Sequence, residues 1–383
     1  MLDGTSQNGS LRISKRRHFT HDAGAGLAKL PAPQSRPADL LNPNLRRLLP
    51  YPFETLARLR ASVTPNADLP PLKMTVGEPG LAPPEAVLEV LHSHLHEFAA
   101  YPPSRGLPEL RQAAAAWLGR RFAAELDPDT QVLPLGGTRE GLFCCAQALI
   151  DPTRPNPTVV VPNPFYKIYE GAAFMAGARP YPLSTGVEAD DFLEALAAVP
   201  EAVWGDCQLL YLCSPNNPTG SVLPPAALER VLHLAERFDF VVAADECYSE
   251  IYPPDGTPPC GLLQASARLG DAACDRALVF HSLSKRSSLA GLRSGFVAGG
   301  AGLIDAMARY RTYHGVTLPV PVQRASIAAW SDEVHVERTR RAYQERFDAA
   351  LAELDCRRPC GGFYLWLDVG GDDCGFAVDL YEQ

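Results

Sequence analysis

Residues 208–246, QLLYLCSPNNPTGSVLPPAALERVLHLAERFDFVVAADE, contain the pattern that decides the fold. An apolar run stands at each end of this stretch, and the segment between them, 224–238, has apolar residues at helical spacing. The same alternation continues on both sides, with the apolar runs PTVVVPN at 157–163 and RALVFHS at 276–282. Apolar strands that alternate with amphipathic helices are typical of a mostly parallel sheet covered by helices. We therefore predict an α/β fold of this kind.

Chain length, charge and apolar content indicate how many domains to expect and which partners are excluded. The 383 residues exceed what one core usually organises, so we expect two domains. The net charge of −9 argues against a nucleic-acid partner, because neutralising phosphates requires concentrated Lys and Arg. No run approaches the roughly 18 apolar residues of a membrane span, so we expect no membrane partner.

The ten cysteines are scattered, with no C-x-x-C pair and no zinc-like Cys/His spacing. We interpret them as reduced thiols of a cytoplasmic protein. His92, His94 and His96 alternate on one helical segment, but no carboxylate motif accompanies them. We predict that they form a polar helix face and that the protein holds no metal.

Residues 1–42 include the basic cluster Lys15, Arg16 and Arg17 but no apolar segment of the kind found in secretory signals. We predict a disordered N-terminal extension. An organelle-targeting segment or a wrongly assigned start are the alternatives.

Polar residues follow the predicted strands, where ligands bind in parallel sheets. Asp245 ends the run FVVAA and, being buried, needs a cationic partner. Lys285 follows the run at 276–282, and the turn LGGTRE at 135–140 opens a helix, which suits a phosphate. Together these features indicate a ligand with a basic ring nitrogen, a carbonyl and a phosphate. Pyridoxal 5′-phosphate has all three.

Three segments, in this order, resemble the motif set of the fold-type I, class I/II aminotransferases: SPNNPTG at 214–220, DECYSEIY at 245–252 and SLSKRSSLAGLRSGF at 282–296. The blocks MTVGEPG, YPPSRGLPELR, LGGTREGLF, PNPFYKIYEGA and GGFYLWLDV are also similar to that family. The resemblance runs from about residue 43 to the end and is strongest to bacterial succinyldiaminopimelate aminotransferases. It implies a large domain with a mostly parallel mixed sheet flanked by helices, and a smaller α+β domain that is incomplete at its C-terminus.

The resemblance implies a catalytic set of Lys285, Asp245 and Tyr248. Lys285 would bind the cofactor aldehyde covalently and carry the proton between the substrate and the cofactor. Asp245 would pair with the ring nitrogen. Asn217 and Tyr248 would hydrogen-bond the phenolic oxygen of the cofactor, and Tyr166 would stack on its ring.

The resemblance also implies a phosphate site and a substrate site. The residues implied to hold the phosphate are Gly137, Thr138, Arg139, Ser282, Ser284 and Arg293. Tyr101 would reach the phosphate of a neighbouring subunit, so we expect a homodimer. Gly77 and Asn217 would line the substrate carboxylate.

The implied domains are a small domain formed by 43–88 with 312–383 and a large cofactor-binding domain at 89–311. The chain departs from the family pattern in two places. GEPGLAPP lacks the short polar run that usually follows GEP, and no arginine near the C-terminus matches the one that grips the substrate carboxylate. We expect either a truncated, poorly active form or a site without this clamp.

The predicted function is transfer of an amino group between glutamate and 2-oxoglutarate on one side and an amino or keto acid on the other. The preferred pair is N-succinyl-LL-2,6-diaminopimelate and N-succinyl-2-amino-6-oxopimelate, in lysine biosynthesis. An aspartate or alanine aminotransferase and a pyridoxal-phosphate-dependent carbon–sulfur β-lyase are alternatives, because the fold does not choose the substrate.

Two other classes are open. Ser282 and Lys285 fit the S-x-x-K pattern of a serine hydrolase, but the accompanying S-D-N and K-T-G motifs are absent from the sequence. A non-catalytic protein that keeps the fold as a binding module is the third alternative.

Overall fold

The computed structural model describes residues 41–70, 72, 74, 76–186, 189–270, 274–315 and 317–382. The predicted disordered extension at 1–42 lies almost wholly outside these residues. Contacts divide the chain into two units, Met1–Pro43 and Asn44–Gln383, and the fold below is that of the second unit. The predicted division of this unit into a small and a large domain stays a prediction.

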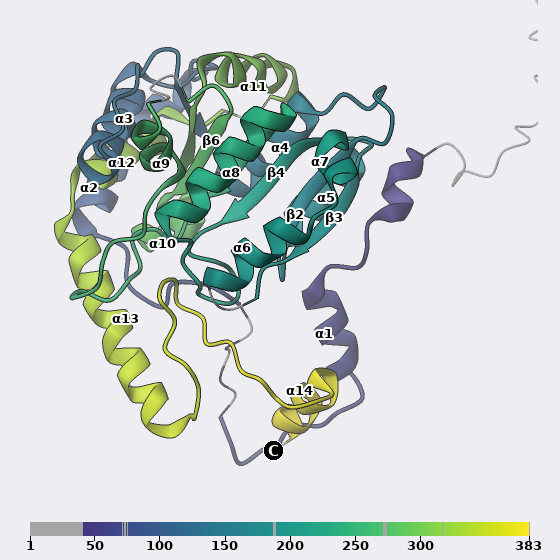
Figure 1. Ribbon diagram of the computed structural model, residues 1–383. Coiled ribbons are helices and arrows are strands. Elements are labelled where there is room, and N and C mark those ends of the chain that lie inside the picture. The colour runs from purple at the N-terminus through teal and green to yellow at the C-terminus, as the bar shows by residue number, and fades with distance from the viewer. Residues whose placement is uncertain are drawn as a thin grey trace, which may run out of the picture. The chain divides into compact units, whose positions relative to one another are not determined.

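Within the described residues, the unit is built on a seven-stranded mixed sheet of order β1-β7-β6-β5-β4-β2-β3 (Figure 1). The strands from β3 to β6 are parallel to their neighbours, whereas β7 is antiparallel to β6 and to β1. This confirms the predicted α/β fold. The bounds are β1 Val132–Leu135, β2 Thr158–Asn163, β3 Arg179–Ser184, β4 Cys207–Cys213, β5 Val241–Asp245, β6 Ala277–Ser282 and β7 Gly295–Gly299.

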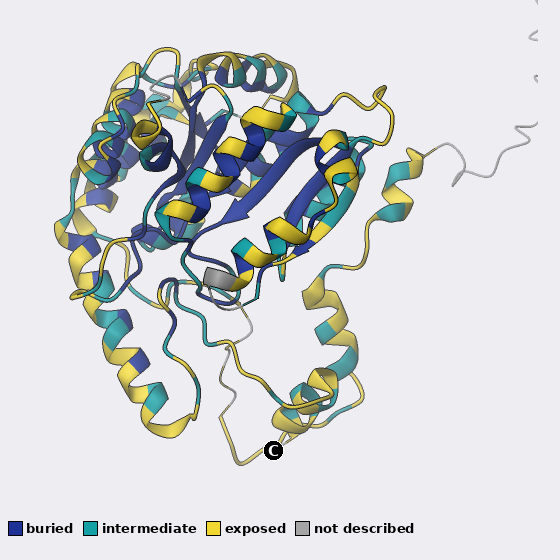
Figure 2. Ribbon diagram, viewed as in Figure 1, coloured by how far each residue is buried: buried dark blue, intermediate teal, exposed yellow. Residues whose placement is uncertain are grey.

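The strands other than the edge strand β3 are mostly apolar because both faces of the sheet are covered there, and the central strands are dark blue in Figure 2. Side chains of one strand alternate between the two faces. In β4, Leu210 and Leu212 belong to one buried cluster and Leu209 and Tyr211 to another. The sheet thus separates two hydrophobic cores.

Helices contribute to each core. The first core takes residues from α2 Glu85–Ser93, α3 Pro108–Phe122, α6 Ala189–Ala198, α7 Glu201–Asp206, α8 Pro225–Phe238, α9 Leu262–Arg268 and α12 Val320–Ser331. The second takes residues from α4 Thr138–Leu149, α5 Ile168–Met175 and α11 Ala301–His314. The remaining elements are η2 Pro43–Arg47, α1 Pro52–Arg60, η3 Leu95–Ala99, α10 Leu283–Arg286, η4 Ala290–Leu292, α13 Val334–Glu353 and α14 Asp373–Glu382. Among the described residues, no helix is both long and apolar enough to cross a membrane.

The register of the central strands positions the functional residues. Cys213 of β4 pairs with Asp245 of β5, and Asp245 pairs with Phe280 of β6. The strands β4 and β5 therefore end level, and β6 continues two residues farther, to Ser282. Because ligands bind at the carboxyl edge of a parallel sheet, the turns that follow the strands are placed to build one site.

A third, smaller core lies against the segment that follows β5. Cys247, Tyr248 and Ile251 pack with Tyr343 and Phe347 of α13. Residues 363–365, which follow α13 in the chain, pack against this cluster. The C-terminal part of the chain is thus joined to the end of the sheet by aromatic and aliphatic contacts.

Candidate active site

Asp245 lies at the last position of β5 and is only 5% exposed. Its carboxylate accepts a hydrogen bond from the Tyr169 hydroxyl (2.9 Å) and one from the Cys247 backbone N–H (3.3 Å). Burial raises the pKa of this carboxyl, and these hydrogen bonds offset the shift only in part. A buried carboxylate held by two neutral donors is suited to a protonated ring nitrogen.

Lys285 lies on the single-turn helix α10, directly after β6. Its Nζ donates to the backbone carbonyl oxygen of Gly77 and lies 5.3 Å from the centre of the Phe363 ring. Burial lowers the pKa of the Lys285 amine. A lowered pKa favours the neutral, nucleophilic form that attack on an aldehyde requires.

The predicted phosphate site brings Gly137 and Arg293 together. A Cβ built at Gly137, which has φ of +90°, would overlap the Arg293 guanidinium, so only glycine permits this approach. Thr138 begins α4, whose N-terminus presents free backbone N–H groups to an anion. Its hydroxyl lies 3.0 Å from the Cys247 sulfur, which places this helix end beside the end of β5.

Ser282 and Ser284 lie at the start of α10. The Ser282 hydroxyl accepts a hydrogen bond from the Ser284 N–H (3.1 Å) and donates to the Ser294 carbonyl (3.4 Å). Ser294 follows Arg293 in the chain. The hydrogen bond from Ser282 to Ser294 therefore places Ser282 and Ser284 close to the backbone of Arg293. Their role as phosphate ligands stays a prediction.

Arg139 makes contacts that its motif does not indicate. Its guanidinium donates to the hydroxyl groups of Tyr166 (2.6 Å) and Tyr51 (3.3 Å). The Tyr166 ring in turn meets the ring of Tyr169 edge to face, at 5.9 Å between centres. Arg139 thereby orients the aromatic residue predicted to stack on the cofactor, and its side chain reaches a phosphate only by releasing these phenols.

Asn217 and Tyr248, both predicted to contact the phenolic oxygen of the cofactor, lie next to each other. The Asn217 side-chain amide donates to the Tyr248 hydroxyl over 3.4 Å. The Tyr248 hydroxyl also lies 2.7 Å from the hydroxyl of Tyr364. Gly77 lies directly against Tyr364, because a Cβ at Gly77 would overlap the Tyr364 ring and hydroxyl.

Tyr101 is the predicted site residue that lies apart. Its side chain is fully exposed in the single chain. The prediction for Tyr101 concerns the site of a neighbouring subunit and stays a prediction.

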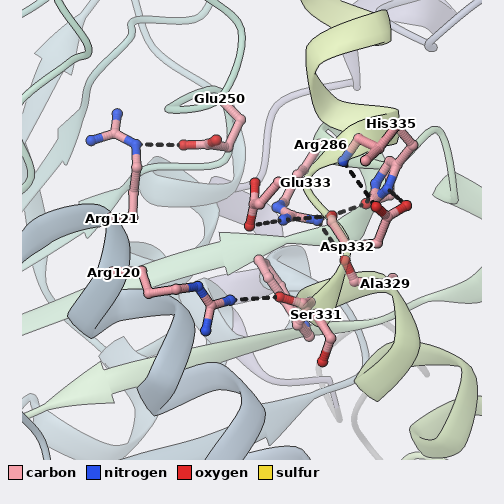
Figure 3. Close-up of polar contacts among 12 residues, drawn as sticks. Arg120, Arg121, Glu250, Arg286, Ala329, Ser331, Asp332, Glu333 and His335 are labelled. Carbon is pink, nitrogen blue, oxygen red and sulfur yellow. Dashed lines mark hydrogen bonds and ion pairs between the residues drawn. The ribbon is translucent and has the colours of Figure 1, made fainter.

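A polar network surrounds Arg286, the residue that follows Lys285 in the chain (Figure 3). Arg286, which is 2% exposed, donates to the carbonyl oxygens of Ala329 (2.7 Å) and Asp332 (3.2 Å) and to the Glu333 carboxylate (2.7 Å). The guanidinium lies 5.6 and 5.0 Å from the rings of Trp117 and Trp330. The α12–α13 junction is thus fastened to the turn that carries Lys285.

His335 adds a second link between these parts. One ring nitrogen lies 2.8 Å from the Ser287 hydroxyl, and the other lies 2.7 Å from the Asp332 carboxylate. Farther along α13, Arg340 reaches the buried Glu250 carboxylate (2.6 Å), which also pairs with Arg121 (2.7 Å). The two guanidinium groups hold the pKa of Glu250 below its usual range despite burial.

Sequence reasoning missed three residues of this region: Tyr169, Tyr364 and Arg286. Tyr169 and Tyr364 lie inside sequence blocks that resemble the family, and Arg286 adjoins Lys285. Membership in these blocks was the available signal. The partner of each side chain is distant in sequence, so the motif alone does not reveal the contact.

The arrangement matches the three chemical demands of pyridoxal phosphate. A buried carboxylate suits the ring nitrogen, an amine with lowered pKa suits the aldehyde, and a glycine-lined helix N-terminus beside an arginine suits the phosphate. These groups come from strand ends at one edge of one sheet. The fold and its site define a pyridoxal-phosphate-dependent enzyme of the transferase type.

Comparison with known proteins gives the family. The model of the family described as Aminotransferase class I and II matches residues 70–383. The chain belongs to this family, and it is accordingly a pyridoxal-phosphate-dependent aminotransferase.

Individual proteins similar to this chain are also aminotransferases. The chain is 32% identical over 349 residues to the LL-diaminopimelate aminotransferase of Desulforudis audaxviator, covering 88% of this chain and 86% of the relative. It is similar to the crystal structure of an aminotransferase from Neisseria meningitidis, at 43% identity, TM-score 0.84 and coverage of 90% and 88%. The aminotransferase AspB from Helicobacter pylori is 36% identical, with TM-score 0.78 and coverage of 88% and 87%.

Proposed function

We propose that this aminotransferase transfers an amino group between glutamate/2-oxoglutarate and a diaminopimelate-type amino acid. The leading substrate pair is N-succinyl-LL-2,6-diaminopimelate and N-succinyl-2-amino-6-oxopimelate, as in lysine biosynthesis. The observation that carries the reaction type is that Asp245 ends β5 and Lys285 follows the neighbouring parallel strand β6, so both lie at the same edge of the sheet.

In this proposal each site residue has its own role in the reaction. The bound cofactor supplies an electron sink for the pair of electrons left at the substrate Cα. Asp245 keeps the ring nitrogen protonated, and Arg293 with the N-terminus of α4 holds the phosphate. The Lys285 amine would take the proton from the substrate Cα and deliver it to the aldehyde carbon of the cofactor; water would then release the keto acid, and the second keto acid would take up the amino group in the reverse half-reaction.

Replacement of Lys285 tests the reaction type. Purified wild-type protein with added pyridoxal phosphate should be yellow. Lys285→Ala should keep the circular dichroism of the fold, lose the visible absorbance and lose about 10²–10⁴-fold or more of the transamination rate. Lys167→Ala, which removes a lysine paired with Glu170 on α5, is the matched control and should stay coloured and active. A colourless wild type that ignores added cofactor would refute the proposal.

The choice of substrate in this proposal rests only on sequence similarity. The sequence blocks resemble succinyldiaminopimelate aminotransferases, while curated relatives at 30–32% identity are named LL-diaminopimelate aminotransferase. Both names indicate a long amino acid with a second charged end. We therefore expect the two diaminopimelates to be used in preference to aspartate and alanine.

A four-substrate comparison decides among these amino donors. N-succinyl-LL-2,6-diaminopimelate, LL-diaminopimelate, aspartate and alanine would each be offered with 2-oxoglutarate, and kcat/KM measured from glutamate formation. We expect the highest value for the succinylated compound. A highest value for LL-diaminopimelate would move the assignment to that substrate, and pyruvate release from a cysteine conjugate would favour the β-lyase.

We also propose that the protein is a homodimer of the cytoplasm. Several apolar side chains between residues 45 and 98 are exposed, and a partner subunit would cover some of them; they include Leu45, Leu49, Phe53, Leu88 and Phe98. Tyr101 follows directly after these segments. Buried thiols without a disulfide, such as Cys207 and Cys213, support a reducing compartment.

A further inference from the structure

We propose that Tyr364 is a positioning residue for the transamination: its hydroxyl donates to the Tyr248 oxygen and thereby directs the Tyr248 proton at the phenolic oxygen of the cofactor. The inference rests on the cofactor contact proposed for Tyr248. It assigns a role to a residue of the C-terminal segment for which the sequence analysis gave none.

The Tyr248 hydroxyl has two hydrogen-bond partners, Tyr364 and Asn217. Tyr364 and Tyr248 are joined by a 2.7 Å contact between their hydroxyl oxygens, although 116 residues separate them in sequence. The Asn217 amide nitrogen lies 3.4 Å from the same Tyr248 oxygen. The amide nitrogen is a donor only, so Tyr248 accepts this hydrogen bond.

The hydrogen-bonding capacity of a phenol then decides where the remaining proton goes. A phenol offers one O–H donor, and its oxygen can accept from partners on either side. When Asn217 and Tyr364 both donate to Tyr248, the Tyr248 proton is left for a third group. An oxygen that carries negative charge attracts this proton more strongly than a neutral phenol does, so a bound cofactor selects this arrangement. The chain Tyr364 to Tyr248 to cofactor is also cooperative, because each donated bond polarises the next.

Packing holds Tyr364 in this place. Its ring lies 5.6 Å from the Tyr248 ring and 4.9 Å from the Phe363 ring, centre to centre. Its hydroxyl and ring edge occupy the space where a Cβ of residue 77 would be, and Gly77 also accepts the hydrogen bond from Lys285. Burial raises the pKa of Tyr364 to about 12, so the phenol is protonated at neutral pH and able to donate.

Loss of the Tyr364 hydroxyl should therefore weaken the donor that faces the cofactor. In Tyr364→Phe, Tyr248 keeps one accepted bond and its O–H becomes less polarised. Negative charge on the cofactor's phenolic oxygen is then stabilised less. We expect the pH midpoint of the bound cofactor's visible absorbance to rise by about 0.5–1 unit, the size of one hydrogen bond's net contribution.

Tyr343 provides the matched control. Its ring is stacked on Phe363 at 5.2 Å between centres, so it belongs to the same aromatic cluster. Its buried hydroxyl has no hydrogen-bond partner among the described residues. Tyr343→Phe thus removes a hydroxyl from this cluster without removing a hydrogen bond, and it should leave the midpoint unchanged.

The experiment compares wild type, Tyr364→Phe, Tyr343→Phe, Tyr248→Phe and the Tyr248→Phe/Tyr364→Phe double variant, each loaded with pyridoxal phosphate. The absorbance midpoint, kcat and KM are measured for each. We expect Tyr364→Phe to raise the midpoint and lower kcat a few-fold with little change in KM. In the Tyr248→Phe background it should have no further effect, because Tyr364 acts through Tyr248.

Each outcome decides the inference. Equal midpoints in wild type and Tyr364→Phe would overturn it, and so would an equal shift in Tyr343→Phe or an undiminished shift in the Tyr248→Phe background. A wild type that binds no cofactor refutes the proposed site, and the present inference with it. A coloured wild type with an unshifted Tyr364→Phe refutes the inference alone.

Discussion

The Arg286 guanidinium donates to the Glu333 carboxylate at 2.7 Å, and this contact joins the turn that carries Lys285 to the start of α13. Arg286 is buried, whereas the Glu333 side chain is 43% exposed. The arginine therefore bears most of the desolvation cost. It recovers this cost through its bonds to backbone carbonyls as well as through the ion pair.

Arg286→Met should destabilise the fold. Methionine fills much of the same volume between the two tryptophans, but the carbonyl oxygens of Ala329 and Asp332 lose their donors. Leaving buried acceptors unpaired costs about 1–3 kcal/mol each, and we expect the free energy of unfolding in urea to fall by about 2–4 kcal/mol. Arg309→Met, which breaks an exposed pair with Asp305, should change it by less than about 1 kcal/mol. Equal losses in the two variants would contradict this role of Arg286.

Gly137→Ala should weaken cofactor binding. The added Cβ meets the Arg293 guanidinium, and φ of +90° at this position strains any side chain. Displacing one charged hydrogen-bond donor from the phosphate corresponds to about a 10–100-fold rise in the Kd for pyridoxal phosphate. Gly205→Ala on α7, where nothing lies within 4 Å of the added Cβ, is the control and should bind as wild type does. Unchanged affinity in Gly137→Ala would exclude this phosphate site.

Asp245→Asn should change how stability depends on pH. Burial raises the pKa of Asp245 above its ordinary value of 3.8, so the folded cofactor-free protein keeps a proton that the unfolded chain has released. The carboxyl's contribution to stability is therefore present at pH below 3.8 and is lost as pH rises through the folded pKa. Relative to Asp245→Asn, cofactor-free wild type should lose stability as the pH rises above 3.8, until the folded carboxyl has ionised.

Thermal unfolding of both proteins across this range, with and without cofactor, measures the effect. Bound pyridoxal phosphate should flatten the difference, because its protonated ring nitrogen compensates the carboxylate. A difference that is independent of pH in the cofactor-free proteins would show that Asp245 has no raised pKa.

The sequence was sufficient for the α/β class and for the strands β2, β4, β5 and β6, whereas β1, β3 and β7 were not among the predicted apolar runs. Apolar runs and helical segments predicted the α/β fold, and the register brings Asp245 level with Cys213 at the end of β4 and with Phe280 near the end of β6. These features follow from local pattern, because period and run length reflect burial of the segment itself. Asn217 and Tyr248 lie next to each other, while their predicted contact with the cofactor stays a prediction.

Contacts between distant segments could not be predicted in the same way. Tyr169 reaches Asp245 across 76 positions and Arg286 reaches Glu333 across 47. Neither pairing leaves a periodic signal. For Arg139 the motif predicts a contact with the phosphate. In the structure its guanidinium donates instead to the hydroxyl groups of Tyr166 and Tyr51.

The last prediction concerns assembly. Tyr101 is fully exposed, and the proposal places its hydroxyl on the phosphate in a second subunit's site. Light scattering should show a dimer. Tyr101→Phe should then raise the Kd for pyridoxal phosphate by about 10-fold or more, because it removes a hydrogen bond to a charged group. A monomer with undiminished cofactor affinity would contradict this arrangement.

Mixed dimers make the test sharper. If Tyr101 serves the neighbour, a dimer of one Lys285→Ala subunit and one Tyr101→Phe subunit has one doubly altered site and one intact site. Lys285→Ala and Tyr101→Phe proteins, unfolded and refolded together at a cofactor concentration too low for Tyr101→Phe, should therefore regain activity that neither has alone. Random pairing gives about one quarter of the wild-type activity per site. If Tyr101 served its own subunit's site, every mixed dimer would carry a defect in each site, and mixing would restore nothing.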